Sequence, residues 1–332
     1  MDGRKIKERF YWKKEKLNLN VLSLFDGISA GQLALKRTNI KINNYFSSEI
    51  DKYAIKITQK NFPNTIQLGN ILEWKNWNLP KIDLVMGGSP CQGFSTAGKG
   101  LNFEDPRSKL FFEFVNILKK YRPKYFLLEN VKMKKEWQDI ISDYIGIEPI
   151  LINSSLVSAQ SRKRLYWTNI PNVVQPEDKK IYLKDIIENG SVDRDKSYCI
   201  DANYYKGGSL KNYLEKSRRQ IVNLSSNDFH QSEKRLMVKT IPHGYIKENI
   251  VARNKYPSLA AQNPDTKYLI QPENENAWRK LTVIECERLQ TFPDNYTEGV
   301  SNTQRYKALG NSWTVDIISH IFSFLPIDFI LY

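Results

Sequence analysis

The sequence predicts an α/β fold in which a doubly wound, largely parallel sheet is covered by helices and carries a small inserted domain. Short apolar runs at residues 20–25, 82–86 and 125–128 are typical of strands buried on both faces of such a sheet. Helical patterns separate these runs, and a glycine-containing turn at residues 26–31 follows the first of them. The length of 332 residues exceeds the usual size of one domain, so we expect either one large α/β unit or a large unit with a smaller one attached.

The composition indicates a globular protein with a polyanionic partner. Hydrophobic residues make up 41% of the chain and charged residues 26%, which allows a sizeable core. The 50 Lys and Arg residues outnumber the 36 Asp and Glu residues and give a formal net charge of +14. Since an excess of this size favours phosphate-rich surfaces, nucleic acid is the first candidate partner.

Cysteine and histidine usage predicts no metal and no disulfide framework. Cys91, Cys199 and Cys286 are far apart and odd in number, and the three histidines have no spacing typical of metal ligands. No apolar run approaches the roughly 18 residues of a membrane span, and the N-terminal residues are charged. We therefore expect no membrane contact and a cytoplasmic location.

The first third of the chain has the layout of a nucleotide-binding unit. The turn at residues 26–31 joins a strand to a helix, where small residues let the backbone approach a cofactor, although it is not the dinucleotide pattern. Glu49 ends a second strand at residues 45–48 and is placed to accept hydrogen bonds from ribose hydroxyls. Asn70 follows a third strand and could meet an adenine edge. Ordinary strand-end solvation explains Glu49 and Asn70 equally well.

The stretch Gly-Gly-Ser-Pro-Cys-Gln-Gly-Phe-Ser at residues 87–95 follows the buried strand 82–86. Its glycines permit unusual backbone geometry and Pro90 stiffens the turn, so that Cys91 is held at the sheet rim as a candidate nucleophile. The stretch alone is equally compatible with Cys91 as a small buried hydrophobe. Residues 96–107 are long enough to form a mobile lid.

Further strand ends deliver charged groups to the same rim. A helix at residues 108–121, with an apolar face, precedes the strand 125–128, which leads directly to Glu129. A strand at about residues 149–157 precedes a segment in which alternation places Arg162 and Arg164 on one face.

The end of the chain is expected to return to the first domain. Residues 313–324 form a helical pattern with one apolar face, which should pack against the sheet beside the first strand. A smaller domain would then be an insertion, which we place at residues 193–281, and the main domain comprises residues 1–192 and 282–332.

Six motifs in a fixed order resemble the DNA (cytosine-5)-methyltransferase family over about residues 19 to 325. They are Phe-x-Gly at Phe25, Pro-Cys-Gln at Cys91, Glu-Asn-Val at Glu129, Gln-x-Arg-x-Arg at Gln160, the run from Arg279 through Asp294, and Gly-Asn-Ser at Gly310. The local sequences at residues 24–28 and 312–315 are similar to those in the catalytic domains of animal de novo methyltransferases, whereas the chain length is similar to that of bacterial or phage enzymes.

The resemblance implies a Rossmann-like methyltransferase sheet and the activity of a DNA (cytosine-5-)-methyltransferase. In this chemistry the Cys91 thiolate adds to C6 of a flipped-out cytosine, which makes C5 nucleophilic toward S-adenosylmethionine. The resemblance implies that Glu129 bonds N3 and the exocyclic amine, that Arg164 binds the O2 side of the base, and that Arg162 belongs to the same catalytic set. A restriction-modification setting is expected.

The resemblance also implies a cofactor site for S-adenosyl-L-methionine. Phe25 would stack on adenine, Glu49 would bind the ribose and Asn70 the adenine amine. The full predicted set is Phe25, Asp26, Gly27, Ile28, Glu49, Ile50, Asn70, Ile71, Gly88, Pro90, Asn311, Ser312 and Trp313. This chain departs from the family in two places, because Ser29 replaces the second glycine of the first motif and Asn70 replaces an aspartate.

The expected partner is double-stranded DNA, read by the inserted domain. The predicted contact residues are Gln92, Ser95, Lys99, Tyr205, Lys206, Arg218, Arg219, Lys234 and Arg235. A cognate restriction endonuclease is a candidate partner, and a monomer is expected. Two alternatives stay open at this point, cytosine-5 methylation of transfer RNA and a non-catalytic nucleic-acid-binding relative. Retention of Cys91, Glu129 and Asn311 together argues against the second.

Overall fold

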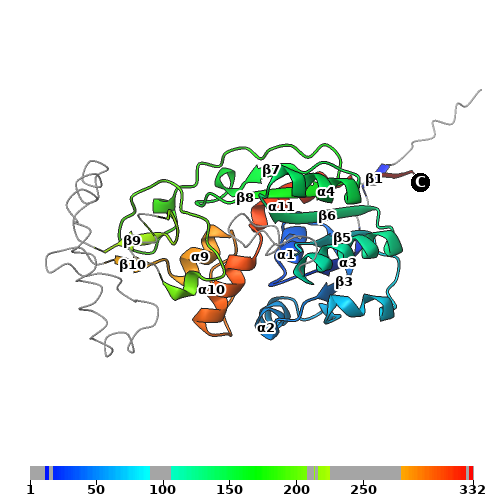
Figure 1. Ribbon diagram of the computed structural model, residues 1–332, viewed down its shortest axis with the longest axis horizontal. Coiled ribbons are helices and arrows are strands. Elements are labelled where there is room, and N and C mark those ends of the chain that lie inside the picture. The colour runs from blue at the N-terminus through cyan, green and yellow to red at the C-terminus, as the bar shows by residue number, and fades with distance from the viewer. Residues whose placement is uncertain are drawn as a thin grey trace, which may run out of the picture.

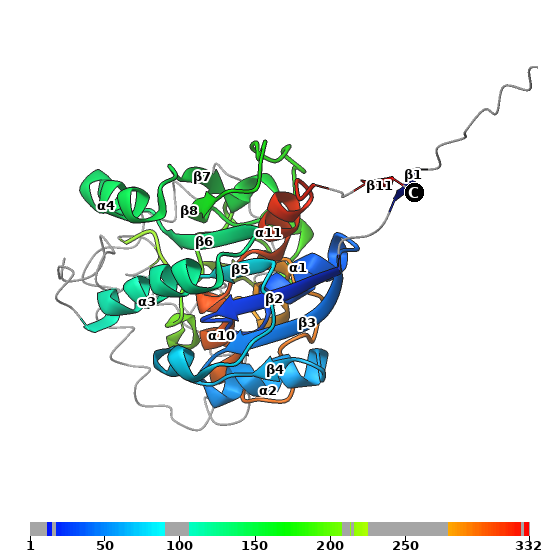
Figure 2. The same cartoon turned by 90° about the vertical axis from the view of Figure 1, so that its right-hand side faces the viewer.

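The computed structural model describes residues 12–14, 18–89, 106–207, 213, 216–224, 278–326 and 329–331. Its centre is a seven-stranded sheet with the strand order β4-β3-β2-β5-β6-β8-β7 (Figures 1 and 2). The strands are β2 (Asn18–Leu24), β3 (Lys41–Ser48), β4 (Ile66–Gln67), β5 (Leu84–Gly87), β6 (Tyr125–Val131), β7 (Ile150–Asn153) and β8 (Lys163–Thr168). All neighbours pair in parallel except β8, which is antiparallel to both β6 and β7. The predicted α/β class is confirmed.

The sheet has a topological switch point beside β2. The chain proceeds outward from β2 to β3 and β4 on one side, and from β5 to β6 on the other. In open α/β sheets, ligands bind at the carboxyl ends of the strands where the order reverses. The site is therefore expected at the carboxyl ends of β2 and β5.

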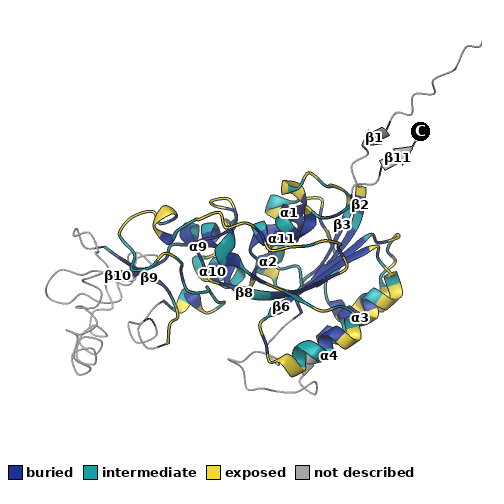
Figure 3. Cartoon of the chain, turned by 90° about the horizontal axis from the view of Figure 1, so that it is seen from above, coloured by how far each residue is buried: buried dark blue, intermediate teal, exposed yellow. Residues whose placement is uncertain are grey.

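Helices cover both faces of the sheet (Figure 3). On one face lie α1 (Ala30–Arg37), α2 (Lys52–Asn61) and α11 (Val315–Phe322), and on the other lie α3 (Pro106–Tyr121) and α4 (Lys135–Ile145). The helices α9 (Val283–Leu289) and α10 (Asn302–Asn311) lie beyond the end of the sheet. Alternate strand residues face opposite cores, so that Val21 packs with α1 and α11 whereas Leu22 packs with α3 and α4. Each buried strand is apolar on both faces for this reason.

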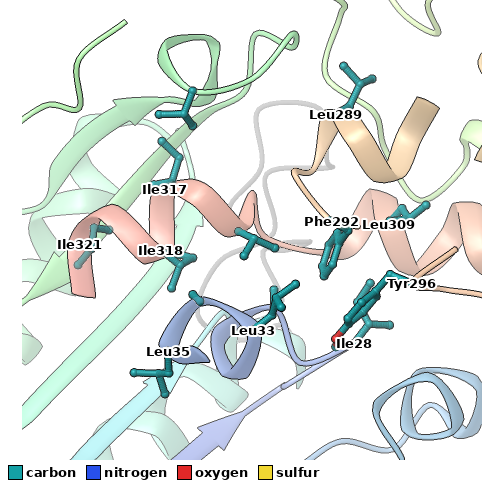
Figure 4. Close-up of a cluster of buried hydrophobic side chains, with 14 of the residues drawn as sticks. Ile28, Leu33, Leu35, Leu289, Phe292, Tyr296, Leu309, Ile317, Ile318 and Ile321 are labelled. Atoms are coloured by element: carbon teal, nitrogen blue, oxygen red, sulfur yellow. The ribbon is translucent and has the colours of Figure 1, made fainter. Parts of the chain in front are cut away.

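The last helix returns to the sheet as expected. The buried residues of α11 include Ile317, Ile318 and Ile321, and they pack beside Leu33 and Leu35 of α1 (Figure 4). The C-terminal part of the chain thus completes the core that the first strand begins.

The strand bounds differ from the predicted ones, and two of the differences concern the site. The strand that carries Glu129 continues to Val131, so Glu129 lies inside β6 and not after it. The strand predicted at residues 149–157 ends at Asn153, because the Asn153 side chain accepts a hydrogen bond from the Ser155 amide and turns the chain into the 3-10 helix η2 (Ser154–Leu156).

Two short strand pairs lie outside the main sheet. β9 (Ile221–Asn223) pairs with β10 (Trp278–Lys280), and β1 (Trp12–Lys14) pairs with β11 (Phe329–Leu331). Figure 1 shows β9 and β10 beyond α9 and α10, at the far end of the molecule from β1 and β11. Both strands of the first pair fall within the predicted inserted domain, whose boundaries at residues 193 and 281 stay a prediction.

Within the described ranges, no helix is long and apolar enough to cross a membrane. The same part of the chain contains no group of three or more His, Cys, Asp or Glu side chains arranged to hold a metal ion.

Candidate active site

A cavity of about 540 Å³ lies at the carboxyl ends of the central strands. It brings together residues that the sequence separates by almost 300 positions, and every predicted catalytic or cofactor residue that the structure describes lines it. These residues are Phe25, Asp26, Gly27, Ile28, Glu49, Ile50, Asn70, Ile71, Gly88, Glu129, Arg162, Arg164, Asn311, Ser312 and Trp313. Pro90, Cys91, Gln92, Ser95, Lys99, Lys234 and Arg235 lie outside the described residues.

The loop after β2 turns through three left-handed residues. Phe25, Gly27 and Ser29 have φ values of 56°, 58° and 57°. Glycine adopts this conformation readily, whereas for Phe or Ser it costs about 1 kcal/mol. Ser29 thus occupies the backbone conformation that explains why the family has glycine at this position.

A buried carboxyl group holds this loop. Asp26 accepts hydrogen bonds from Ser23 and Tyr45 at 2.6 and 2.7 Å on one oxygen, and from Ser47 and Ser29 on the other. Burial raises the pKa of Asp26, and the four hydroxyl donors oppose that increase. Although Asp26 lines the cavity, its carboxyl oxygens are bonded to protein hydroxyls, so its side chain anchors the loop to β2 and β3.

Glu49 lies between β3 and α2 and binds three backbone amides. Its Oε1 accepts from the Ile50 and Asp51 amides, each at 2.8 Å, and its Oε2 accepts from the Gly27 amide at 2.8 Å. A carboxylate offers about four acceptor positions. The remaining position is on Oε2, which is where a ribose hydroxyl would donate.

Asn70 caps the 3-10 helix η1 (Ile71–Asn76) through Oδ1, which accepts from the Leu72 amide at 3.0 Å. Two large apolar side chains that line the cavity near it are strongly exposed, Ile50 at 73% and Leu72 at 59%. Exposed apolar side chains around an amide form a suitable surface for a flat heteroaromatic ring. Sequence reasoning missed Leu72, because only the fold shows that it lines the cavity.

The loop toward Cys91 is tied to β6. Asn130 is 1% exposed, and its Nδ2 donates to Ser89 Oγ at 3.3 Å. Ser89 precedes Cys91 by two residues. The Asn of the Glu-Asn-Val motif therefore connects the strand that carries Glu129 to the start of the predicted nucleophile loop.

Glu129 is held between Arg164 and Trp313. Its Oε1 forms an ion pair with Arg164 Nε at 3.0 Å, and its Oε2 accepts a hydrogen bond from Trp313 Nε1 at 3.2 Å. The Glu129 side chain is only 11% exposed and the Arg164 side chain 14%. The antiparallel register of β6 and β8 pairs Glu129 with Tyr166 and Val131 with Arg164, so the arginine reaches Glu129 diagonally across the two strands.

Arg162 lies beside Arg164 but contacts mainly the backbone. Its guanidinium donates to the carbonyls of Ile200 at 3.0 Å, Ser312 at 2.8 Å and Gly310 at 3.3 Å. The residue is 4% exposed, and its Nε is buried without a hydrogen-bond partner among the described residues. Arg162 thus joins the predicted cofactor turn to the segment around Ile200, at the start of the predicted inserted domain.

Gly310 allows these two segments to touch. A Cβ atom there would lie 2.1 Å from the Asp201 carbonyl carbon. Backbone atoms at that distance cannot move aside cheaply, so only glycine fits this contact.

Cys199 is a site residue that sequence reasoning missed. Its sulfur accepts from Arg162 Nη1 at 3.2 Å and lies 3.9 Å from Arg164 Nη2. Burial disfavours the thiolate, but the two guanidinium groups outweigh burial and lower the pKa of Cys199. No local pattern around residue 199 signals this, because Arg162 and Arg164 come from a distant segment at the start of β8.

The described DNA-contact candidates lie outside the cavity. Lys206 is exposed and lies over the Tyr205 ring at 5.8 Å. Arg218 is exposed and pairs with Asp201 at 3.3 Å, whereas Arg219 donates to the Gly207 carbonyl at 3.0 Å. Their contact with DNA stays a prediction.

Comparison with known proteins identifies the family. The profile of the C-5 cytosine-specific DNA methylase family matches residues 19–325. Type II methyltransferase M1.ScrFI of Lactococcus lactis subsp. cremoris is 33% identical over 323 residues, covering 91% of this chain and 76% of that protein. Type II methyltransferase M.HaeII of Haemophilus aegyptius is 31% identical over 316 residues and covers 90% of each chain.

Solved structures share the fold. A DNMT2 variant of Spodoptera frugiperda is similar with a TM-score of 0.62 at 19% identity, covering 92% of this chain and 99% of that one. The methyltransferase EhMeth of Entamoeba histolytica gives a TM-score of 0.63 at 19% identity, covering 93% and 98%. The chain belongs to the C-5 cytosine-specific DNA methylase family, and the predicted enzyme class, DNA (cytosine-5-)-methyltransferase, is confirmed.

Proposed function

We propose that this protein transfers a methyl group from S-adenosyl-L-methionine to C5 of a flipped-out cytosine in a specific duplex DNA sequence. The observation that carries this proposal is the convergence of the predicted cofactor residues and of Glu129, Arg162 and Arg164 on one cavity. The type II methyltransferases among the relatives support a restriction-modification setting with a cognate endonuclease.

The chemistry of the cavity suits S-adenosylmethionine. Ile50 and Leu72 offer apolar contact for the adenine, Asn70 offers an amide to its edge, and Glu49 Oε2 offers one acceptor to the ribose. Asn311 and Ser312 lie at the turn that Arg162 holds and would bind the methionine end. When bound, this cofactor supplies an electrophilic methyl group on a sulfonium.

The base-binding residues would act in sequence. The Cys91 thiolate would add to C6 and leave C5 as a nucleophilic enamine carbon. Glu129 would accept from the exocyclic amine and bond N3, while Arg164 would bind the O2 side of the base. After transfer, the C5 proton would leave to an ordered water or hydroxide, and the C6–S bond would break to restore the Cys91 thiolate.

The target would be read outside the catalytic domain. A cytosine within a duplex cannot reach the cavity unless it is flipped out of the stack. The segment at residues 193–281 would contact the DNA grooves and phosphates, and the Arg162 bonds would place its first residues against the cofactor turn.

The first experiment measures transfer of labelled methyl groups from S-adenosylmethionine to duplex DNA and, in parallel, to transfer RNA. Bisulfite sequencing of the DNA product should place the label at C5 of cytosines that share a short sequence context. Label only in RNA would replace the proposed substrate, and label in neither would refute the proposed activity.

Two variants test the residues. Cys91→Ala should abolish transfer and also the denaturant-resistant adduct with duplex DNA that contains 5-fluorocytosine, while DNA binding persists. Glu129→Gln should lower kcat by about 10²-fold or more, because an amide cannot replace the carboxylate toward N3. Full turnover by either variant would remove that residue from the mechanism.

A further inference from the structure

The indole of Trp313 contacts both ends of the site. Trp313 follows Asn311 and Ser312 and lines the same cavity as they do, and its Nε1 donates to Glu129 Oε2 at 3.2 Å. We propose that Trp313 is a positioning residue for the Glu129 carboxylate. This inference rests on the proposed methyl transfer, in which Glu129 bonds the cytosine.

Two donors from different elements determine the plane of the Glu129 carboxylate. Arg164 Nε belongs to β8 and forms an ion pair with Oε1 at 3.0 Å, whereas Trp313 Nε1 comes from the turn between α10 and α11 and donates a hydrogen bond to Oε2. Without such contacts, the terminal torsion of a glutamate side chain rotates broadly. Among the described residues one donor group contacts each oxygen, so each oxygen keeps a second acceptor position for a donor in the cavity. Two such positions match the exocyclic amine and a protonated N3.

Two glycines make room for the indole. A Cβ atom on Gly88 would lie 3.0 Å from Trp313 Nε1 and 3.1 Å from Glu129 Oε2. A Cβ atom on Gly31 would lie 2.5 Å from Met86 Cε and 3.3 Å from Trp313 Cζ3, so Gly31 makes room first for Met86 and then for the indole. Gly88 has no left-handed φ, so its need for glycine comes from space at the hydrogen bond and not from backbone strain. The loop toward Cys91 therefore leaves space for Trp313 at the atom that contacts Glu129.

The test variant is Trp313→Phe, which keeps an aromatic ring and removes the N–H donor. Loss of one hydrogen bond to a charged group corresponds to a roughly tenfold lower kcat for methyl transfer to duplex DNA. The KM for S-adenosylmethionine should stay within about twofold, because the ring remains. A residue with only a structural role would lower thermal stability and leave kcat at saturating substrate unchanged.

Gly88→Ala provides a second, independent perturbation of the same hydrogen bond. Its Cβ would push Nε1 and Oε2 apart, so we expect a similar fall in kcat. In a double-mutant cycle, adding Gly88→Ala to Trp313→Phe should lower kcat by no more than about a further twofold, because the hydrogen bond between Trp313 and Glu129 is already absent.

Trp74 supplies a matched control. The Trp74 Nε1 donates to Glu113 Oε2 at 2.5 Å, which is again a hydrogen bond from an indole to a glutamate, here between η1 and α3. Trp74 does not line the cavity. Trp74→Phe should lower the melting temperature and leave kcat unchanged.

The outcomes separate this inference from the proposed function. An active wild type with an unchanged kcat in Trp313→Phe, or with fully multiplicative losses in the cycle, would overturn the positioning role and leave the methyltransferase proposal intact. A wild type that binds S-adenosylmethionine but methylates neither DNA nor RNA would overturn both.

Discussion

Replacing Arg162 by lysine separates two roles for this arginine. The sequence predicts a catalytic residue, whereas the structure shows a buried guanidinium that donates to backbone carbonyls of two distant segments, at Ile200 and Ser312. A lysine ammonium keeps the charge but cannot reproduce the planar fork. It can retain one of these two short bonds and not both.

The expected loss follows from the contacts. The bonds to Ser312 and Ile200 measure 2.8 and 3.0 Å, and the third, to Gly310, is longer at 3.3 Å. At about 1.5 kcal/mol for each bond to a charged group, losing one or two should cost about 1.5 to 3 kcal/mol of unfolding free energy. Because Ser312 lies in the proposed cofactor turn, a loss of about 1.4 kcal/mol in binding would weaken affinity for S-adenosylmethionine about tenfold.

The assay combines urea unfolding, calorimetric titration of S-adenosylmethionine and kcat at saturating cofactor. We expect Arg162→Lys to lower stability and cofactor affinity together, with kcat reduced less than about threefold. Arg37→Lys is the control, since Arg37 forms a partly exposed ion pair with Asp316 and its change should cost under about 0.5 kcal/mol. A kcat lowered by orders of magnitude at unchanged stability would refute the reasoning and restore a direct catalytic role.

Three further predictions concern buried groups. Ser29→Ala keeps the left-handed backbone strain and loses the hydrogen bond to Asp26, so it should lower the free energy of unfolding by about 2 kcal/mol. Ser29→Gly loses the same bond but relieves the strain, so its loss in urea unfolding should be about 1 kcal/mol smaller. An equal loss in the two variants would contradict strain at this position. The pKa of Cys199 is lowered in the folded protein, so the contribution of its thiolate to stability should grow as the pH rises toward about 8.5 and fade at lower pH. The difference in unfolding free energy between the wild type and Cys199→Ser should therefore widen from about pH 6 to 8.5. A constant difference would contradict a thiolate at this position. Arg279 is 2% exposed and pairs with the fully buried Glu285 at 2.6 Å, so Arg279→Met should cost about 3 kcal/mol or more, while Arg279→Met with Glu285→Leu should recover part of that loss in thermal unfolding.

The sequence by itself determined the order of the elements and most of the residues that line the cavity, although it did not indicate Leu72. Apolar runs and spacing predicted the buried strands and the apolar faces of α3 and α11, since Phe111, Phe114 and Ile317 are fully buried as expected. The motifs predicted which residues would gather at the sheet rim, because parallel strands bring their carboxyl ends to one edge and every loop that follows them must meet there.

Only the tertiary structure decided what each side chain does in that cavity. Asp26 bonds hydroxyls from two strands, Arg162 joins segments that follow it by 38 and 150 residues, and Trp313 reaches Glu129 across 184 positions. The Asp26 bonds depend on the register between β2 and β3, and the other pairs depend on the close approach that Gly88 and Gly310 allow. Register and approach are set by packing of the whole core, and local sequence patterns carry no record of that packing.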